Sequence, residues 1–147
     1  MSAEANRALQ ERYLTEVWDA RDPDAEARFA APGYRRYITP GEPPIDLAGQ
    51  IEREKRFFTA FPDGTIEPHE IVVDDHFVAM RATGRGTNLG RWADYAPTGR
   101  SIEVTIVDLK RVENGRFIEH WGGPDRLEMA RQLGITLVPP GSGHQRR

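Results

Sequence analysis

The sequence predicts an α+β domain in which N-terminal helices pack against a strongly curved, mostly antiparallel sheet. Two observations carry this prediction. Residues 4–61 show apolar side chains at helical spacing, whereas residues 65–121 show short alternating segments separated by turn signals. Because the two patterns occupy separate parts of the chain, they indicate an α+β fold. The 147 residues suit one domain, expected over residues 1–138, with a loose tail at 139–147.

The N-terminal part is expected to contain three helices. The first, over residues 4–20, has an apolar stripe formed by Leu9, Tyr13, Leu14, Val17 and Trp18. The second runs from a cap at Asp24 to Ala31, where Pro32 and Gly33 should end it. A short extended piece and a proline-rich loop then lead to the third helix. That helix is expected to begin at Asp46 and end at Phe61, with Leu47, Ile51, Phe58 and Phe61 facing the core.

The C-terminal part is expected to contain two hairpins and a short helix. Residues 65–75 and 77–87 flank the turn signal "DDH", and residues 100–112 and 116–121 flank "ENG". Asp125 is then placed to open a helix that Gly134 closes. Glycines 84, 86 and 90 could supply the bends that a cone-shaped sheet with an open mouth requires.

Composition limits the classes of function. A net charge of −3 and a pI near 5.8 argue against a nucleic-acid-binding protein. The chain has no Cys, which excludes disulfides and thiolate chemistry, and its four His show no HxH or HxxxH spacing, so no metal site is expected. No segment resembles a signal peptide or a membrane span, and a cytoplasmic protein without membrane contact is the expectation.

Several motifs in order along the chain resemble one known family. They are "FPD" at the end of a helix, "GRGTNLGRWADYAPTGRSIEV", "VENGRFIEHW", an Asp soon after, and "QLG" in the last helix. Together they resemble the SnoaL-like polyketide cyclases, or ester cyclases, which have the NTF2-like fold. The resemblance runs from the first helix to Gly134. The sequence departs from it at Asn88 and Tyr37, where many relatives have His.

The resemblance implies a cone with a hydrophobic pocket, no required cofactor or metal, and a homodimer. It implies intramolecular aldol-type ring closure by general acid/base catalysis on an apolar, polyketide-like carbonyl substrate. Asp125 matches the catalytic Asp of the family. The alternative for Asp125 is an N-cap, which satisfies free amides at the start of a helix. Two alternative functions stay open: a hydrolase, dehydratase or isomerase with an Asp-based site, and a non-catalytic small-molecule-binding or dimerisation domain.

His120 and Asp108 are the other catalytic candidates. His120 shares strand phase with Ile118, and it becomes a partner for Asp125 if that face points inward. Asp108 lies in phase with the apolar residues of "IEVTIVDLK", so it lies either in a pocket or where the sheet meets solvent. Lys110 follows in the same phase, which favours a face that emerges into solvent.

The candidates for substrate binding are mostly aromatic. A phenol donates to a carbonyl, large aromatic side chains form apolar pocket walls, and an Arg can orient a carboxylate. These candidates are Tyr37, Trp18, Phe58, Trp92, Trp121 and Arg81.

Overall fold

A five-stranded sheet forms the centre of the computed structural model, which describes residues 2–136 and 138. The predicted tail at 139–147 lies outside the described residues. The strands are β1 (Ala30–Tyr37), β2 (Thr65–Val73), β3 (Phe77–Thr87), β4 (Ser101–Glu113) and β5 (Arg116–Pro124). The α-helices are α1 (Ala3–Tyr13), α2 (Leu47–Ala60) and α3 (Arg126–Gln132).

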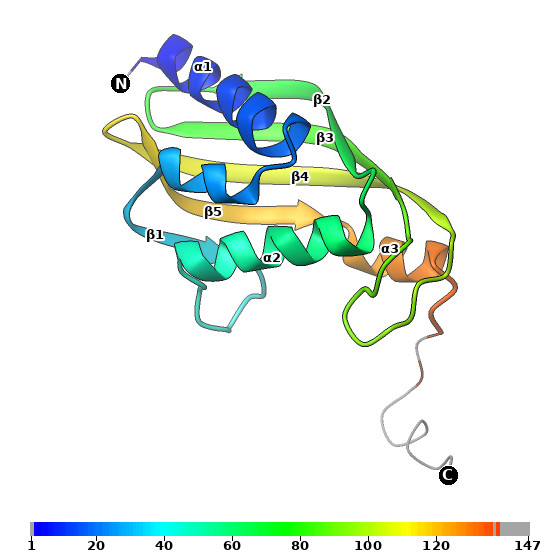
Figure 1. Ribbon diagram of the computed structural model, residues 1–147. Helices are drawn as coiled ribbons and strands as arrows, with labels where there is room; N and C mark the ends of the chain where they lie inside the picture. The colour runs from blue at the N-terminus through cyan, green and yellow to red at the C-terminus, as the bar shows by residue number, and fades with distance from the viewer. Residues whose placement is uncertain (1, 137, 139–147) are drawn as a thin grey trace.

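The order of the strands is β1-β5-β4-β3-β2. β1 runs parallel to β5, and every other neighbouring pair is antiparallel. The sheet curves, with α1 and α2 on one face and α3 beyond the end of β5 (Figure 1). The predicted α+β class with a mostly antiparallel, curved sheet is therefore confirmed. None of the helices in the described part of the chain is long and apolar enough to cross a membrane.

The first helix buries the predicted stripe. Leu9, Tyr13, Leu14 and Val17 are all buried, because α1 and the π-helical segment Leu14–Asp19 that continues it lie on the sheet. Trp18 is half-buried and packs at the edge of this cluster. The α2 helix begins where predicted, with the Asp46 carboxylate accepting a hydrogen bond from Gly49 N at 2.9 Å.

The segment after the first helix differs from the prediction. A short 3₁₀ helix covers Pro23–Arg28, and β1 already begins at Ala30, so Pro32 and Gly33 lie in a strand instead of ending a helix. β1 is an edge strand, where a Pro without an N–H is tolerated. The β1–β5 register also shifts between Ala30 and Arg35. Gly33 has φ +81°, which a Gly adopts without strain.

A bulge in β5 changes which side chains face the interior. Arg111 pairs with Glu119 but Val112 pairs with Phe117, so Ile118 is the extra residue. As a result Phe117 and His120 are both buried, although simple alternation places them on opposite faces. β5 also continues through Gly122 and Gly123 to Pro124, so "GGP" belongs to the strand and is not a turn.

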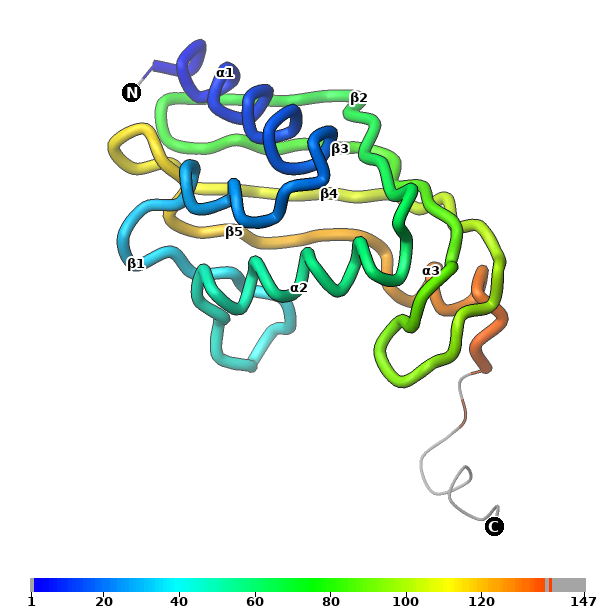
Figure 2. The backbone as a smooth tube through the Cα atoms, viewed as in Figure 1, coloured from blue at the N-terminus to red at the C-terminus, as the bar shows by residue number. Residues whose placement is uncertain are grey.

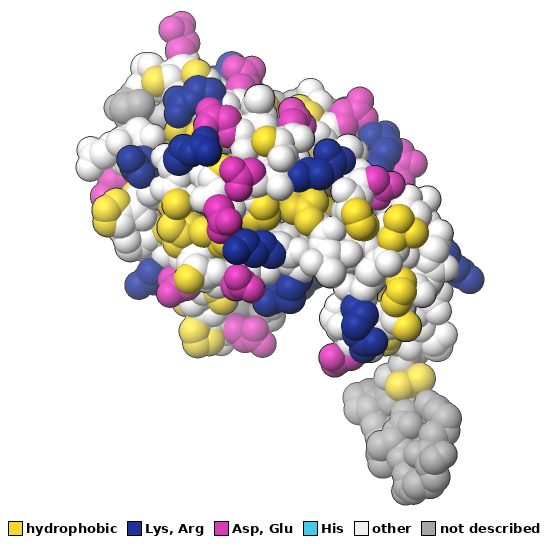
Figure 3. Space-filling model, in the orientation of Figure 1, with side chains coloured by type: hydrophobic (Ala, Val, Ile, Leu, Met, Phe, Trp, Pro, Cys, Tyr) yellow, Lys and Arg dark blue, Asp and Glu magenta, His cyan; other side chains and the backbone are white. Residues whose placement is uncertain are grey.

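Two apolar clusters hold these elements together. The larger lies between the N-terminal helices and the inner face of the sheet, and the smaller joins the end of α2, β4 and α3. Trp92 packs on the smaller cluster from the β3–β4 connection, which extends beyond the sheet (Figure 2). Asn88 fixes that connection: its side-chain oxygen accepts a hydrogen bond from Thr98 N at 2.9 Å and its amide donates to Gly90 O. Charged side chains of both signs are mixed on the helical face (Figure 3).

Candidate active site

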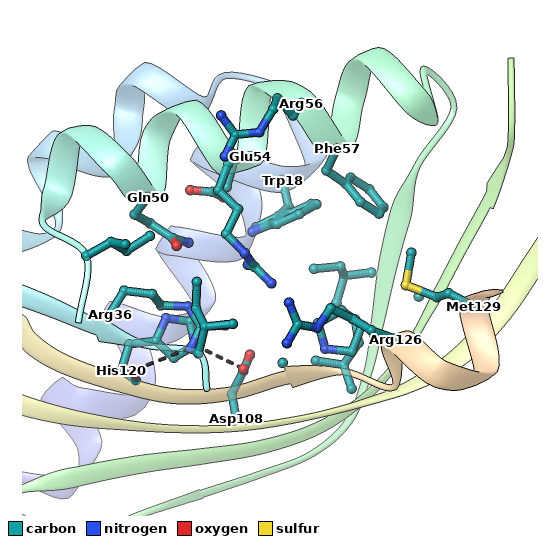
Figure 4. Close-up of a pocket in the computed structure, with 18 of the residues that line it drawn as sticks. Trp18, Arg36, Gln50, Glu54, Arg56, Phe57, Asp108, His120, Arg126 and Met129 are labelled. Atoms are coloured by element: carbon teal, nitrogen blue, oxygen red, sulfur yellow. Dashed lines mark hydrogen bonds and ion pairs between the residues drawn. The ribbon is translucent and has the colours of Figure 1, made fainter. Parts of the chain in front are cut away.

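A cavity of about 590 Å³ lies between α2 and the inner face of the sheet (Figure 4). Its walls are largely apolar, with Trp18 and Phe57 on the helical side, Trp92 from the β3–β4 connection, and Ile106 and other aliphatic residues on the sheet. A few polar side chains project into it, as expected of a small-molecule site. They include Arg36, Gln50, Arg53, Glu54, Asp108, His120 and Arg126.

Asp108 and His120 form a pair on neighbouring strands at the floor of this cavity. His120 Nε2 lies 2.9 Å from Asp108 Oδ1, and the two side chains are only 6% and 12% exposed. His120 Nδ1 lies 3.4 Å from the hydroxyl of Tyr34. The bond to the carboxylate places the proton on Nε2, so Nδ1 accepts from Tyr34. Both ring nitrogens are therefore engaged, and Asp108 holds the free acceptor oxygen.

The surroundings favour an ionised Asp108 beside a neutral His120. Burial alone would raise the pKa of Asp108, but His120, Lys110 and Arg36 outweigh it and hold that pKa below its ordinary value. Burial lowers the pKa of His120 to about 4, although the neighbouring carboxylate opposes this shift. At neutral pH the pair thus carries one negative charge, on Asp108.

Arg36 anchors the floor from β1. It is 1% exposed, and its guanidinium donates to backbone oxygens of Tyr37, His120 and Gly122 at 3.1, 3.3 and 2.6 Å. Its Nε is buried and has no hydrogen-bond partner in the described part of the protein. Arg36 therefore fixes the backbone that carries His120 and places a positive charge near Asp108.

Glu54 projects from α2 into the same cavity (Figure 4). It is 2% exposed, and neither of its carboxyl oxygens has a hydrogen-bond partner among the described residues. Burial, followed by the nearby Glu26 carboxyl, raises the pKa of Glu54 well above its ordinary value, against the opposing effect of Lys110 and Arg53. These surroundings therefore favour the protonated form of Glu54.

Lys110 does not emerge into solvent, which corrects the expectation from its strand phase. It is 2% exposed, its amine donates to Gln10 Oε1 at 3.1 Å, and it lies 3.5 Å from the Tyr13 ring centroid and 4.3 Å from that of Phe117. These contacts replace water around the cation. The inner face of β4 therefore stays buried beyond Asp108. Asp108 consequently lies in a pocket and not where the sheet meets solvent.

Asp125 takes the capping role. Its carboxylate accepts a hydrogen bond from Glu128 N at 3.0 Å at the start of α3, the residue is exposed, and it is not among the residues that line the cavity. The structure brings His120 together with Asp108 instead. The physical reason is that "GGP" continues β5, so the chain leaves the cavity floor before it reaches Asp125.

Two of the six predicted binding residues, Trp18 and Trp92, line the cavity. Phe58 lies behind Trp18, with ring centroids 5.0 Å apart. The rings of Tyr37 and Trp121 stack with their centroids 5.3 Å apart, outside the cavity, because Trp121 directly follows the inward-facing His120 in β5 and so points to the opposite face.

The remaining predicted binding residue, Arg81, lies on the exposed surface. Its guanidinium donates two hydrogen bonds to the Glu70 carboxylate, at 2.8 and 2.6 Å. The pair spans β2 and β3 on the outer face, so Arg81 is not placed to orient a carboxylate of the site.

Sequence reasoning missed Glu54, Gln50, Arg53 and Arg36. A signal existed for α2, because Gln50, Glu54, Phe57 and Phe61 share one helical stripe, whereas the predicted core face was Leu47, Ile51, Phe58 and Phe61. The structure buries two polar residues of this stripe, Gln50 and Glu54.

For the described residues, no group of three or more His, Cys, Asp or Glu side chains is arranged to hold a metal ion.

The chain was compared with known proteins. A search of curated sequences gave no match. Among solved structures, AclR from Streptomyces galilaeus, a proposed hydroxylase, superposes with a TM-score of 0.82 at 23% identity, covering 95% of this chain and 87% of AclR. TsrD from Streptomyces laurentii superposes with a TM-score of 0.79 at 25% identity, and the match covers 92% of this chain and 99% of TsrD. IdmH from Streptomyces antibioticus, a proposed polyketide cyclase, superposes with a TM-score of 0.74 at 28% identity, and the match covers 88% of this chain and 98% of IdmH.

These neighbours share the NTF2-like fold, which confirms the architecture expected from the sequence motifs. At the family level, residues 8–133 match the SnoaL-like polyketide cyclase family. That range contains β1 to β5, the cavity and the Asp108–His120 pair. The chain therefore belongs to the SnoaL-like polyketide cyclase family.

Proposed function

We propose that this protein is an acid/base enzyme that closes a ring in an apolar carbonyl substrate by intramolecular aldol addition. One observation carries the proposal: Asp108 and Glu54 line the same apolar cavity, and their surroundings move the two pKa values in opposite directions. Such separation assigns one carboxyl group as base and the other as acid. Membership of the family, and the similarity to IdmH, support a cyclase reaction.

Asp108 is the base in this mechanism. Its free oxygen removes a proton from a carbon flanked by two carbonyl groups, and the resulting enolate carbon attacks a second carbonyl carbon of the same molecule. His120 acts as a positioning residue, because its Nε2–H holds the carboxylate and its Nδ1 is occupied by Tyr34. A carbon acid of this kind is acidic enough for a carboxylate base.

Glu54 completes the reaction as the acid. When the new carbon–carbon bond forms, the accepting carbonyl oxygen becomes an alkoxide, and protonated Glu54 delivers a proton to it. The net change in the substrate is a new carbon–carbon bond in place of one carbonyl π bond, with one proton moved from carbon to oxygen. Asp108 and Glu54 return to their starting states by proton exchange with water.

The first test replaces the base. The substrate is an aryl β-keto ester with a second carbonyl placed to accept the carbon nucleophile, and ring closure is followed by absorbance. Asp108→Asn should lower kcat/KM by about 100-fold or more, since general-base catalysis contributes roughly that much. Asp125→Asn is the matched control, because Asn also caps helices and Asp125 lies outside the cavity. Loss of activity in Asp125→Asn but not in Asp108→Asn would reassign the base.

The second test concerns the acid. Wild-type kcat should fall as pH rises through the raised pKa of Glu54, because the group then loses the proton it must donate. Glu54→Gln keeps an N–H donor but no transferable proton, so kcat should drop and this alkaline decline should disappear. Glu70→Gln, an exposed carboxylate on β2, serves as the control. An unchanged pH profile in Glu54→Gln would remove Glu54 from the mechanism.

A further inference from the structure

The inner part of the cavity carries an excess of positive charge. Buried Arg36, half-buried Arg53 and exposed Arg126 line it, and Asp108 is the ionised carboxylate beside them. The raised pKa of Glu54 favours its protonated form, which carries no negative charge. The other acidic residues that line the cavity, Glu42 and Glu52, are both exposed to solvent. A cavity with this balance favours a ligand that brings negative charge.

Arg53 and Arg126 line the cavity without a carboxylate partner among the described residues. Within the described part of the chain, neither makes an ion pair or a hydrogen bond to a carboxylate. Five other arginines do so, at distances of 2.5 to 2.6 Å: Arg28, Arg81, Arg85, Arg111 and Arg131. The donors of Arg53 and Arg126 are therefore available to a ligand that enters the cavity.

The three guanidinium groups lie close enough to repel one another. Burial lowers the pKa of Arg53 to about 10, and the next causes are the nearby charges of Arg36 and Arg126. Figure 4 shows Arg126 reaching from α3 toward Asp108. Like charges held together in a half-buried site are costly unless an anion lies between them.

The geometry leaves room for such an anion next to the base. Arg53 and Arg126 also line a recess of about 210 Å³, together with Gly122, Gly123 and Pro124 of β5. Gly122 is the register partner of Asp108, so the recess adjoins the strand position of the catalytic base.

We propose that Arg53 and Arg126 form an anion clamp, and that the substrate is an acidic one whose carboxylate binds between these two arginines while its apolar body fills the cavity. A planar guanidinium forms paired, charge-assisted hydrogen bonds with a carboxylate. This deepens the proposed function, because it rests on the same cavity and names the class of substrate. The clamp fixes one end of the substrate so that its activated carbon lies over Asp108.

Binding of a simple aromatic acid tests the clamp without any turnover. Isothermal titration calorimetry compares a naphthalene carboxylate with the corresponding carboxamide, which has the same shape and no charge. Wild-type protein should bind the carboxylate about tenfold tighter or more, as charge-assisted pairing with two arginines implies. In the Arg53→Gln/Arg126→Gln double variant, affinity for the carboxylate should fall to the level of the amide, and affinity for the amide should stay within about threefold.

Two further variants separate the possible explanations. Arg81→Gln removes an exposed, paired arginine outside the cavity, and it should leave the preference for the carboxylate intact. Asp108→Asn removes the proposed base and a nearby negative charge, so the carboxylate should bind as tightly as to wild type or more tightly. The clamp predicts that Asp108→Asn still binds the carboxylate, whether or not Asp108 is the base of the proposed reaction. Failure of the clamp can therefore be distinguished from failure of the proposed reaction.

Three results would overturn the clamp. One is equal affinity of wild type for the acid and the amide. Another is a preference for the acid that survives the double replacement, with circular dichroism showing that the variant is folded. The third is failure of the carboxylate to bind wild type at millimolar concentration, since two unpaired arginines in a half-buried site should hold an aromatic acid more tightly than that.

Discussion

His120 is neutral because of where it lies, and this makes its contribution to stability depend on pH. Its pKa is lowered to about 4 by burial, whereas in the unfolded chain it returns to the ordinary 6.5. Between these two values the unfolded state binds more protons than the folded state. The free energy of unfolding should therefore fall as pH decreases from 6.5 toward 4.

Replacing His120 by Asn tests this linkage. The pKa of His120 differs by about 2.5 between the unfolded and the folded chain. The free energy of unfolding of the wild type should therefore fall by about 3 kcal/mol between pH 6.5 and pH 4 because of this residue. Urea unfolding at a series of pH values should show that His120→Asn lacks this part of the slope. His69→Asn, an exposed residue on β2, is the control and should keep the wild-type slope. Parallel curves for wild type and His120→Asn would contradict the assignment of a neutral His120.

At the scale of elements, the end of β5 depends on glycine. A Cβ at Gly122 would lie 2.1 Å from Val107 O, and Gly122 also has φ +90°. Gly122→Ala should therefore push β5 away from β4, and this is the pairing that places His120 beside Asp108. The expected loss is about 2–4 kcal/mol in the free energy of unfolding, with lower activity.

Gly99→Ala separates the effect of the steric clash from the effect of backbone strain. Gly99 has φ +73°, but a Cβ at this position would meet no atom within 4 Å, so only backbone strain applies, at about 1–2 kcal/mol. Thermal or urea unfolding of both variants gives the comparison. Equal losses in the two variants would show that close packing of β5 on β4 does not contribute.

At the scale of the whole molecule, the outer face of the sheet carries an apolar row that crosses every strand. Register partners lie on the same face, and the row runs through Val72, Ala79, Leu109, Trp121 and Tyr37. Val72 is 65% and Leu109 40% exposed. An apolar row of this kind, exposed at Val72 and Leu109, favours contact with another protein surface. We propose that two copies of the chain pair through this face as a homodimer.

Leu109→Glu should disrupt this dimer, because it buries an unpaired charge at the centre of the contact on both copies. Sedimentation velocity at micromolar concentration should show a dimer for wild type and a monomer for the variant. Leu127→Glu on α3 changes an equally apolar and more exposed residue away from the sheet, and the dimer should persist. A wild-type monomer under these conditions would refute the proposal.

The sequence alone was sufficient for the fold class, for the apolar stripe of the first helix and for the caps at Asp46 and Asp125. Periodicity, capping residues and turn signals are local properties, and they act over a few neighbours along the chain. The ordered motifs also pointed to the family that the comparison then confirmed. The presence of Asp108 and His120 among the candidates followed from residue type and strand phase.

Only the tertiary structure decided which of these residues meet. The bulge at Ile118 turned His120 inward, and contacts with Tyr13 and Phe117 buried Lys110 instead of exposing it. The packing of α2 across the sheet brought Glu54 into the cavity from a helix face that looked polar. These outcomes depend on register and on partners distant in the chain, which local spacing does not encode.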